Sequence, residues 1–314
     1  MSAELATAVD RGARSLAIPD DGTLLLAVSG GPDSMALLHG AATLVAMGAR
    51  RWQLSVAHLD HALRPESAAD ATFVAEVAAS LQIPVTVERQ EVDALARQSR
   101  IGIEEAGRDA RYRFFDSIAP PDALIATAHT ADDAAETVLL NLMRGSGLNG
   151  ARGIPARRGR LVRPLLGARR AALRALLDAD GLAYRLDASN MDPAFLRNRV
   201  RAELLPVLEE LRPGAVDSLN RFARLAGDDE ELLHRLAADE LVRRRAADGG
   251  LDWREPPSAA LGRRVLRMAI GDPPPAAERV EALLEAAAGP RGGLRIELGE
   301  GRTAVIRGRA ITFE

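Results

Sequence analysis

The first half of the chain alternates short aliphatic runs with longer segments in which apolar residues recur at helical spacing. Strands are predicted at residues 23–28, 54–57, 84–89 and 123–128. Helices are predicted after each of these strands, at about 35–45, 67–81, 103–118 and 131–143. Because elements that alternate in this way form right-handed βαβ units, the pattern predicts an α/β fold with a doubly wound, mainly parallel sheet.

The second half is mainly helical, with predicted helices at residues 171–179, 197–210 and 216–244. Residues 248–257 are rich in Gly and Pro and predict a linker or boundary. The chain ends in short predicted strands with turns at Glu300-Gly301 and Arg307-Gly308. We therefore expect a catalytic domain over residues 1–213, followed by a helical linker and a small β-containing C-terminal region over residues 214–314.

The composition is that of an ordinary globular protein, with 47% hydrophobic and 27% charged residues among 314. No apolar run approaches the roughly 18 residues of a membrane span, and the first residues lack the pattern of a leader. We therefore expect a cytoplasmic protein without a membrane partner. The absence of cysteine excludes a disulfide, a thiolate metal site and a cysteine nucleophile.

The net charge of -3 argues weakly against nucleic-acid binding, but the basic residues are unevenly distributed. All 41 are arginines. Residues 137–177 contain no carboxylate and nine arginines. Such a block can neutralise phosphates even in a slightly acidic protein, although a solvated surface in an arginine-rich chain is the alternative.

The segment Ser29-Gly30-Gly31-Pro32-Asp33-Ser34 lies where the first strand ends and the first helix begins. Its glycines allow close approach to a phosphate, its hydroxyls can donate hydrogen bonds, and a helix start offers unpaired N–H groups. The segment therefore predicts an anion site. It is not a Walker A loop, which needs a lysine, nor a dinucleotide fingerprint. The alternative is a simple turn in which Asp33 and Ser34 cap the helix.

Polar residues also follow the second and third strands. His58-Leu59-Asp60-His61 lies at a strand end, where open α/β sheets bind ligands, but it is weak evidence for a metal site. In the helix at 103–118, Glu104, Arg108 and Arg111 share a face. That spacing suits ligand contact and, equally, ion pairs that stabilise the helix.

Three acids follow the fourth strand. Thr130 and Asp133 have the spacing of a capping pair, but capping does not require the additional Asp132 and Glu136. A helix would gather these acids near the predicted phosphate site, where they could bind Mg²⁺ or an ammonium group. Further along, Arg197, Arg199 and Arg201 alternate with other residues, which suits phosphate contact although a helix would point them in more than one direction.

The motifs of tRNA(Ile)-lysidine synthetases resemble segments of this chain in the same order. SGGPDS marks only the PP-loop, or N-type ATP pyrophosphatase, superfamily, whereas the longer segments are more specific. The resemblance covers residues from about 22 to 210 and implies an adenine nucleotide alpha hydrolase-like fold. The segments are SGGPDS, HLDHALRPES, EEAGRDARYRF, TAHTADDAAETVLLNLMRGSG, RPLL, DASNMDPAFLRNRVR and LLPVLEEL.

The resemblance implies a two-step reaction that consumes ATP. The C2 oxygen of the wobble cytidine in an isoleucine tRNA with a CAU anticodon attacks the α-phosphate and releases pyrophosphate. The ε-amine of free L-lysine then attacks C2 and displaces AMP, which leaves lysidine. This chemistry requires positioning, charge neutralisation and a base that is taken out of its stack.

The resemblance also implies roles for individual residues. Asp33, Arg108 and Asp133 would be catalytic, with Mg²⁺ on Asp33 and Asp133. Asp132 and Glu136 would bind the lysine ammonium, and His129 could carry a proton. ATP would be bound by Ser29, Gly30, Gly31, Pro32, Asp33, Ser34 and His58. tRNA or phosphate would contact Arg111, Arg144, Arg197, Arg199 and Arg201, and Arg111 could also offset charge on the α-phosphate.

The chain departs from the family pattern in two places. Ala134 stands where members often carry Gln, and only about 100 residues follow Pro213, so we expect an abbreviated tRNA-binding region. Other PP-loop enzymes are alternatives, but sulfur-inserting ones generally use cysteine, and ammonia-using synthetases do not explain the arginine block. A non-catalytic nucleotide sensor or tRNA-binding protein is the alternative from another class. The sequence leaves the oligomeric state open, including a homodimer.

Overall fold

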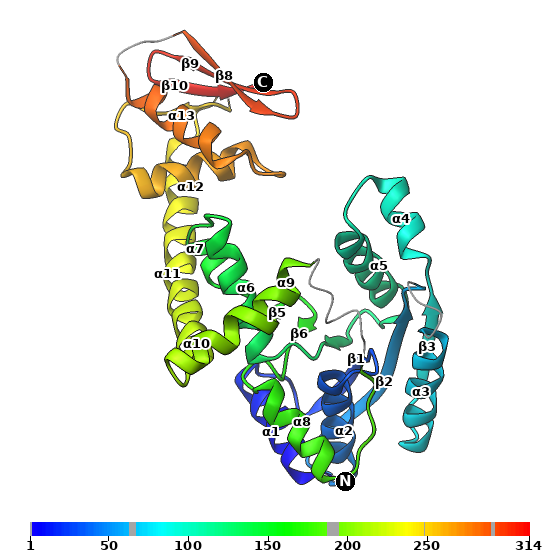
Figure 1. Ribbon diagram of the computed structural model, residues 1–314. Coiled ribbons are helices and arrows are strands. Elements are labelled where there is room, and N and C mark those ends of the chain that lie inside the picture. Colours follow the sequence, from blue (N-terminus) through cyan, green and yellow to red (C-terminus); the bar gives the residue numbers. More distant parts are fainter. Residues whose placement is uncertain (1, 63–66, 187–194, 248, 290–292) are drawn as a thin grey trace. The chain divides into compact units, whose positions relative to one another are not determined.

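The computed structural model describes residues 2–62, 67–186, 195–247, 249–289 and 293–314 (Figure 1). The chain forms two compact units, Met1–Ala223 and Arg224–Glu314. They divide inside the long helix α11 (Ala215–Arg244), whereas the sequence suggested a boundary at residue 213. In the described ranges, no helix has both the length and the apolar character needed to cross a membrane.

The first unit contains a six-stranded sheet in the order β3-β2-β1-β4-β6-β5. All neighbouring strands are parallel except β5 and β6, which confirms the predicted mainly parallel sheet. The strands are β1 (Asp21–Ala27), β2 (Arg51–Asp60), β3 (Val85–Arg89), β4 (Leu124–Ala126), β5 (Arg157–Arg158) and β6 (Leu161–Val162).

The helices predicted after the four strands and the helix predicted at 171–179 are present, and α6 has the predicted bounds. They are α2 (Pro32–Ala46), α3 (Ser67–Ser80), α5 (Ile103–Ile118), α6 (Ala131–Met143) and α8 (Arg170–Ala179). The helix expected at 197–210 is divided into α9 (Leu196–Arg199), the π-helical turn η2 (Val200–Leu204) and α10 (Leu205–Leu211). Three helices were not predicted: α1 (Ala3–Ser15), α4 (Val92–Ser99) and α7 (Leu148–Ala151).

Both faces of the sheet are covered, as the alternation along β1 shows. Leu24 and Leu26 are buried in one hydrophobic cluster with residues of α1 and α2. Leu25, between them, is buried in a second cluster with Phe114 and Phe115 of α5. Because successive strand residues point to opposite faces, this continuous apolar run is what a parallel sheet with helices on both sides requires.

Helix α1 packs closely against α2 and the segment before α8. Ser2 caps its start by accepting a hydrogen bond from the Leu5 N–H at 3.2 Å, and Leu5, Val9 and Ala13 are buried on one face. A Cβ added to Gly12 would lie 1.7 Å from the carbonyl oxygen of Pro164. This glycine therefore permits a backbone approach that no other residue would allow.

The second unit has its own core and an antiparallel sheet in the order β7-β10-β9-β8. The predicted terminal turns are confirmed by Gly301 and Gly308, which have positive φ angles of 77° and 61°. The prediction of a linker at 248–257 was wrong in part, because this segment contains β7 and the fully buried Trp253. The elements are β7 (Leu251–Asp252), α12 (Ala259–Ile270), α13 (Ala277–Ala288), β8 (Leu294–Gly299), β9 (Arg302–Arg307) and β10 (Ala310–Phe313).

Substitution of Gly12 by Ala tests the close packing of α1. Helix propensity alone would stabilise the variant by up to about 1 kcal/mol. We expect the opposite, a loss of about 1–3 kcal/mol in the free energy of unfolding of the first unit, because the Pro164 backbone has to move. Urea titration measures this quantity.

Gly167→Ala is the matched control, since nothing lies within 4 Å of a Cβ added there, its φ is not positive and it lies outside the helices. Its unfolding free energy should not fall, because alanine fits such a position without strain. A Gly12→Ala variant as stable as the wild type would contradict the packing described for α1.

Candidate functional site

The candidate site lies at the carboxyl ends of β1 and β4. Within the sheet, β2 and β3 lie on one side of β1, and the next strand, β4, lies on the other side of β1. Parallel sheets bind ligands where the strand order reverses in this way. The topology therefore brings the 29–34 loop after β1 next to the acids at the start of α6.

The 29–34 loop turns sharply into α2 without a side-chain cap. Gly30 has a φ of +89°, and the helix begins at Pro32 after an N-cap Gly31 that makes no side-chain hydrogen bond. The Ser34 hydroxyl accepts from the Ser29 N–H at 3.2 Å and donates to the Gly31 carbonyl at 2.9 Å. Since Asp33 does not cap the helix, the simple-turn alternative does not account for this carboxylate.

The start of α6 orients its three acids differently. The predicted capping pair is confirmed, because Asp133 Oδ2 accepts from the backbone N–H and the hydroxyl of Thr130, each at 2.8 Å. Asp132 accepts from the first backbone N–H of α8, at Arg170, at 2.8 Å. The Glu136 side chain is completely buried, one turn further along the helix.

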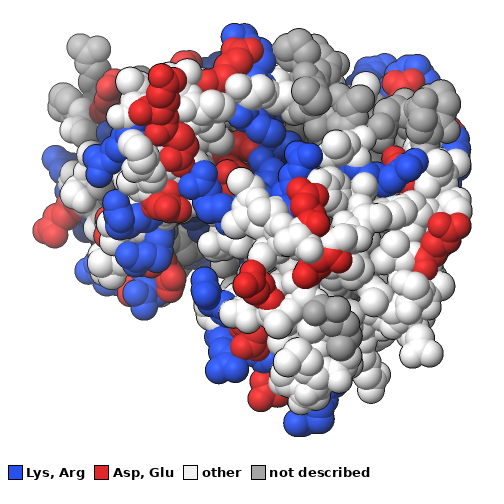
Figure 2. All heavy atoms as spheres, turned by 60° about the horizontal axis from the view of Figure 1, so that its bottom comes forward, with Lys and Arg blue, Asp and Glu red and all other residues white. Residues whose placement is uncertain are grey.

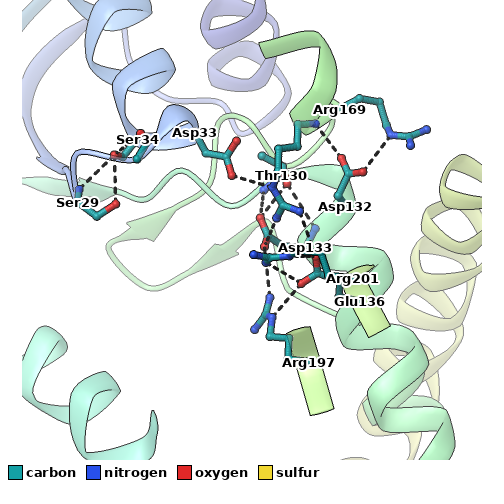
Figure 3. Close-up of polar contacts among 12 residues, drawn as sticks. Ser29, Asp33, Ser34, Thr130, Asp132, Asp133, Glu136, Arg169, Arg197 and Arg201 are labelled. Carbon is teal, nitrogen blue, oxygen red and sulfur yellow. Dashed lines mark hydrogen bonds and ion pairs between the residues drawn. The ribbon is translucent and has the colours of Figure 1, made fainter. Parts of the chain in front are cut away.

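Arginines from α8, α9 and η2 contact these acids, as Figure 3 shows for Arg197 and Arg201. Arg197 Nε lies 2.9 Å from Glu136 Oε2, and Arg201 Nε lies 2.7 Å from Glu136 Oε1. Arg170 reaches Asp33 Oδ2 at 3.1 Å. We call Asp33, Asp133, Glu136, Arg170, Arg197 and Arg201 the acid–arginine cluster.

Burial and ion pairing act in opposite directions on the two aspartates of this cluster. Burial raises the pKa of Asp33 above its usual range, and the Arg170 guanidinium only partly opposes this. Burial would also raise the pKa of Asp133, but Arg170 and the Thr130 N–H outweigh it and lower the pKa to about 2. Asp133 is therefore a fixed negative charge at neutral pH.

A pocket of about 400 Å³ adjoins the cluster at Arg197. The described residues of its lining include no carboxylate, which suits an anionic ligand. Arg197 both lines the pocket and contacts the cluster. We call this the arginine pocket; its charged and aromatic lining residues are Arg108, Tyr112, His129, Arg144, Arg158, Arg163, Phe195 and Arg197.

His129 is the titratable group of the arginine pocket. Its Nδ1 lies 2.9 Å from the hydroxyl of Thr127. Burial lowers its pKa to about 4, with Arg163 and Arg197 adding to the effect and Asp133 opposing it. The imidazole is therefore neutral at pH 7. A pKa this low makes it a weak proton acceptor, so its expected role as a proton carrier stays a prediction.

Other predicted site residues lie elsewhere. His58 is buried, with Nδ1 2.8 Å from the carbonyl oxygen of Val28, so its ring supports the β1 end of the sheet. Arg111 lies 3.4 Å from His61 Nε2, and Arg199 forms an exposed ion pair with Glu203 at 3.1 Å. None of these contacts joins the cluster. Residues 63–66 and 187–194 of the matched motifs lie outside the described residues.

Arg170 and Arg163 belong to the arginine block at residues 137–177, but no specific role was predicted for either. Arg170 is the first residue of α8, and Arg163 directly follows β6. Both positions are near strand ends on the side of the sheet that carries the site, which is the one pattern that could have identified them. Pairing Arg170 with a particular acid required the tertiary structure.

The described residues include no group of three or more side chains arranged to hold a metal ion. Mg²⁺ sites in nucleotide enzymes, however, commonly use one or two carboxylates together with phosphates and water. Asp33 suits that arrangement, because its Oδ1 is buried without a hydrogen-bond partner. Both oxygens of Asp133 are occupied, so Asp133 fits only after it releases an arginine.

Charge at the surface is mixed. Figure 2 shows one face, on which arginine and acidic side chains occur in small groups rather than in one large field of a single sign. In contrast, the residues that the structure describes around the arginine pocket carry no negative charge.

Fold and site together define a PP-loop protein. The model of the PP-loop domain family matches residues 4–208. A solved structure of a U34-tRNA thiolase from Methanococcus maripaludis has the same fold, with a TM-score of 0.60 and 15% identity over 71% of this chain and 79% of that one.

Two relatives narrow the family. A tRNA(Ile)-lysidine synthase of Geobacter sulfurreducens is 46% identical over 226 residues, which are 70% of this chain and 47% of that protein. One of Salinispora tropica is 43% identical over 242 residues, 74% of this chain and 71% of that protein. The chain therefore belongs to the tRNA(Ile)-lysidine synthase family of PP-loop proteins, and it spans about half the length of the G. sulfurreducens relative.

The lowered pKa of His129 predicts a specific pH dependence of stability. Between pH 6.5 and about 4, the unfolded chain binds a proton at this residue and the folded chain does not, so stability falls as pH falls through that range. When the pH is lowered from 7 to 5, the unfolding free energy of the wild type should therefore fall by about 1–2 kcal/mol more than that of His129→Gln. Urea titrations at both pH values provide the comparison. Equal losses would show that His129 titrates normally.

Proposed function

We propose that this protein ligates free L-lysine to C2 of the wobble cytidine in an isoleucine tRNA with a CAU anticodon, using ATP. The observation that carries the proposal is the unbroken series of contacts from the 29–34 loop to the arginine pocket. Asp33 belongs to that loop, Arg170 joins it to Asp133 and Glu136, and Arg197 joins these acids to the pocket.

The 29–34 loop is the proposed site of the ATP phosphates. Its glycines and the start of α2 offer backbone N–H groups to an anion, and the hydroxyls of Ser29 and Ser34 lie beside them. Mg²⁺, when bound to Asp33, would neutralise phosphate charge. In the first step the cytidine C2 oxygen forms a bond to the α-phosphorus, and the bond to the pyrophosphate leaving group breaks.

The arginine pocket is the proposed site of the tRNA nucleotide. Its arginines can contact phosphate oxygens, and Tyr112 and Phe195 offer aromatic faces to a base that has left its stack. Of the arginines expected to contact tRNA or phosphate, Arg144 and Arg197 line this pocket. Arg108, which also lines it, is positioned to offset charge on the adenylated intermediate.

The acids of α6 are the proposed site of the lysine ammonium. Asp132 and Glu136 belong to the same helix and lie between the two anion sites along the chain of contacts. In the second step the amine nitrogen bonds to C2, the bond from C2 to the AMP oxygen breaks, and the amine loses a proton. His129 is the proposed carrier of that proton to water, since an imidazole with so low a pKa does not retain a proton.

We further propose that the second unit supports tRNA binding rather than chemistry, because every strand-end motif lies in the first unit. The division inside α11 gives a better truncation point than residue 213. Val216 is buried in the first unit, and Asn220 donates to the Ala131 carbonyl at 2.9 Å.

The reaction predicts definite products. With ATP, radiolabelled lysine and the tRNA, we expect AMP and pyrophosphate in equal amounts and lysine incorporated into the tRNA. The same tRNA with uridine at the wobble position should incorporate none, since it lacks the reacting cytidine. Asp33→Asn should stay folded and lose most activity. ADP and inorganic phosphate as products, or incorporation of ammonia in place of lysine, would contradict the proposal.

A chain ending at Ala223 tests the division of labour. We expect it to bind a fluorescent ATP analogue with unchanged affinity and to bind tRNA more weakly than the full chain, because the catalytic sheet is retained and a recognition surface is lost. Titrations at two salt concentrations separate phosphate contacts from other contacts, and a thermal melt verifies folding. Retained tRNA affinity together with lost ATP binding would reverse the assignment.

A further inference from the structure

Arg170 contacts four carboxylates at once. Its backbone N–H donates to Asp132, and its three guanidinium nitrogens donate to three different acids. The distances are 2.8 Å from N to Asp132 Oδ2, 3.1 Å from Nε to Asp33 Oδ2, 2.7 Å from Nη2 to Asp133 Oδ1 and 3.1 Å from Nη1 to Glu136 Oε1. A planar guanidinium can satisfy three acceptors in this way, whereas an ammonium group cannot match its geometry.

Asp33 depends on Arg170 more than the other acids do. Among the described residues, Arg170 is its ion-pair partner, while Asp133 and Glu136 are also held by Arg197 and Arg201. The second oxygen of Asp33, Oδ1, is buried and has no partner. Removal of the Arg170 side chain would therefore leave the partly buried Asp33 carboxylate without its ion-pair partner, opposed only by the charge of Arg201, and so more attractive to a small cation.

The ion pairs occupy most of the carboxylate oxygens of the cluster. Three carboxylates, Asp33, Asp133 and Glu136, face three guanidinium groups. Asp133 uses Oδ2 for Thr130 and Oδ1 for arginines. A divalent ion cannot bind Asp33 and Asp133 together unless Arg170 moves away from both.

We propose that Arg170 is a positioning residue that acts as the internal cation of the site. It holds Asp33 beside the α6 acids while no ligand is bound, and it competes with a divalent cation for Asp33 and Asp133. This inference deepens the proposed function but depends only on charge and geometry within the first unit. It predicts that loss of the guanidinium makes the protein bind divalent cations more tightly.

The test measures binding of Mn²⁺, as a probe for Mg²⁺, by electron paramagnetic resonance without ATP, lysine or tRNA. Arg170→Gln should bind Mn²⁺ about tenfold more tightly than the wild type, because one competing charge is gone. Arg174→Gln is the matched control. Arg174 lies on the same helix one turn away, is half exposed, and pairs with Asp178 at 3.9 Å outside the cluster, so its loss should leave Mn²⁺ affinity unchanged.

Two further variants make the result decisive. Arg170→Gln combined with Asp33→Asn should lose the gain in affinity, since Asp33 is the carboxylate that Arg170 releases. Arg170→Lys keeps a charge but not the three-way geometry, so it should show a smaller gain of a few-fold, and it decides the matter if Arg170→Gln does not fold in a thermal melt.

Unchanged Mn²⁺ affinity in folded Arg170 variants, or a gain that survives loss of Asp33, would overturn the proposal. Because no substrate is present, this outcome is independent of lysine incorporation. A protein that forms lysidine but fails the Mn²⁺ test refutes only the role of Arg170. One that passes the Mn²⁺ test without forming lysidine refutes only the proposed function.

Discussion

The ion pairing of buried carboxylates with guanidinium groups is the constraint on which the site depends. Asp33 lies in the first turn of α2 and Asp133 in the first turn of α6, on either side of the strand-order reversal. Both contact Arg170, and without it their like charges would repel each other. Arg170 offsets that repulsion and joins the two helix starts. The same contacts hold α8 and the α9–η2 segment against α6. The packing of these helices therefore depends on the ion pairs of the site.

The fold supplies the geometry that makes this pairing possible. Close packing of α1 on α2, permitted by Gly40, and of α1 on the Pro164 backbone, permitted by Gly12, fixes the helix that begins at the 29–34 loop. The capping box of α6 uses one oxygen of Asp133 and leaves the other for arginines. Arg197 and Arg201 are four residues apart across the junction of α9 and η2, so they share a face, while Arg199 points to solvent.

Periodicity and strand-end loops were sufficient to predict the parallel sheet, the bounds of α6, the turn at residues 29–34 and the acids that lie near it. Those features depend on residues close in sequence. Helix α1 and the strand β7 were missed because their burial is set by distant partners, the former against α2 and the latter within the second unit. The role of Arg170 could not be predicted either, since its contact with Asp33 spans 137 residues of sequence. Spacing carries no information about such a pair.

Stability does not explain why the cluster exists. Removing charges from water costs several kcal/mol per ion, and well-packed apolar residues in place of a buried ion pair are often neutral or stabilising. The completely buried Glu136, contacted by three arginines, is therefore an expensive arrangement for a structural purpose alone. The free energy lost by removing these charges from water is consistent with a site whose acids have to stay ionised and in place for a cationic ligand. Arginine suits this arrangement, because its planar fork can pair with several carboxylates at once and is more weakly hydrated than an ammonium group.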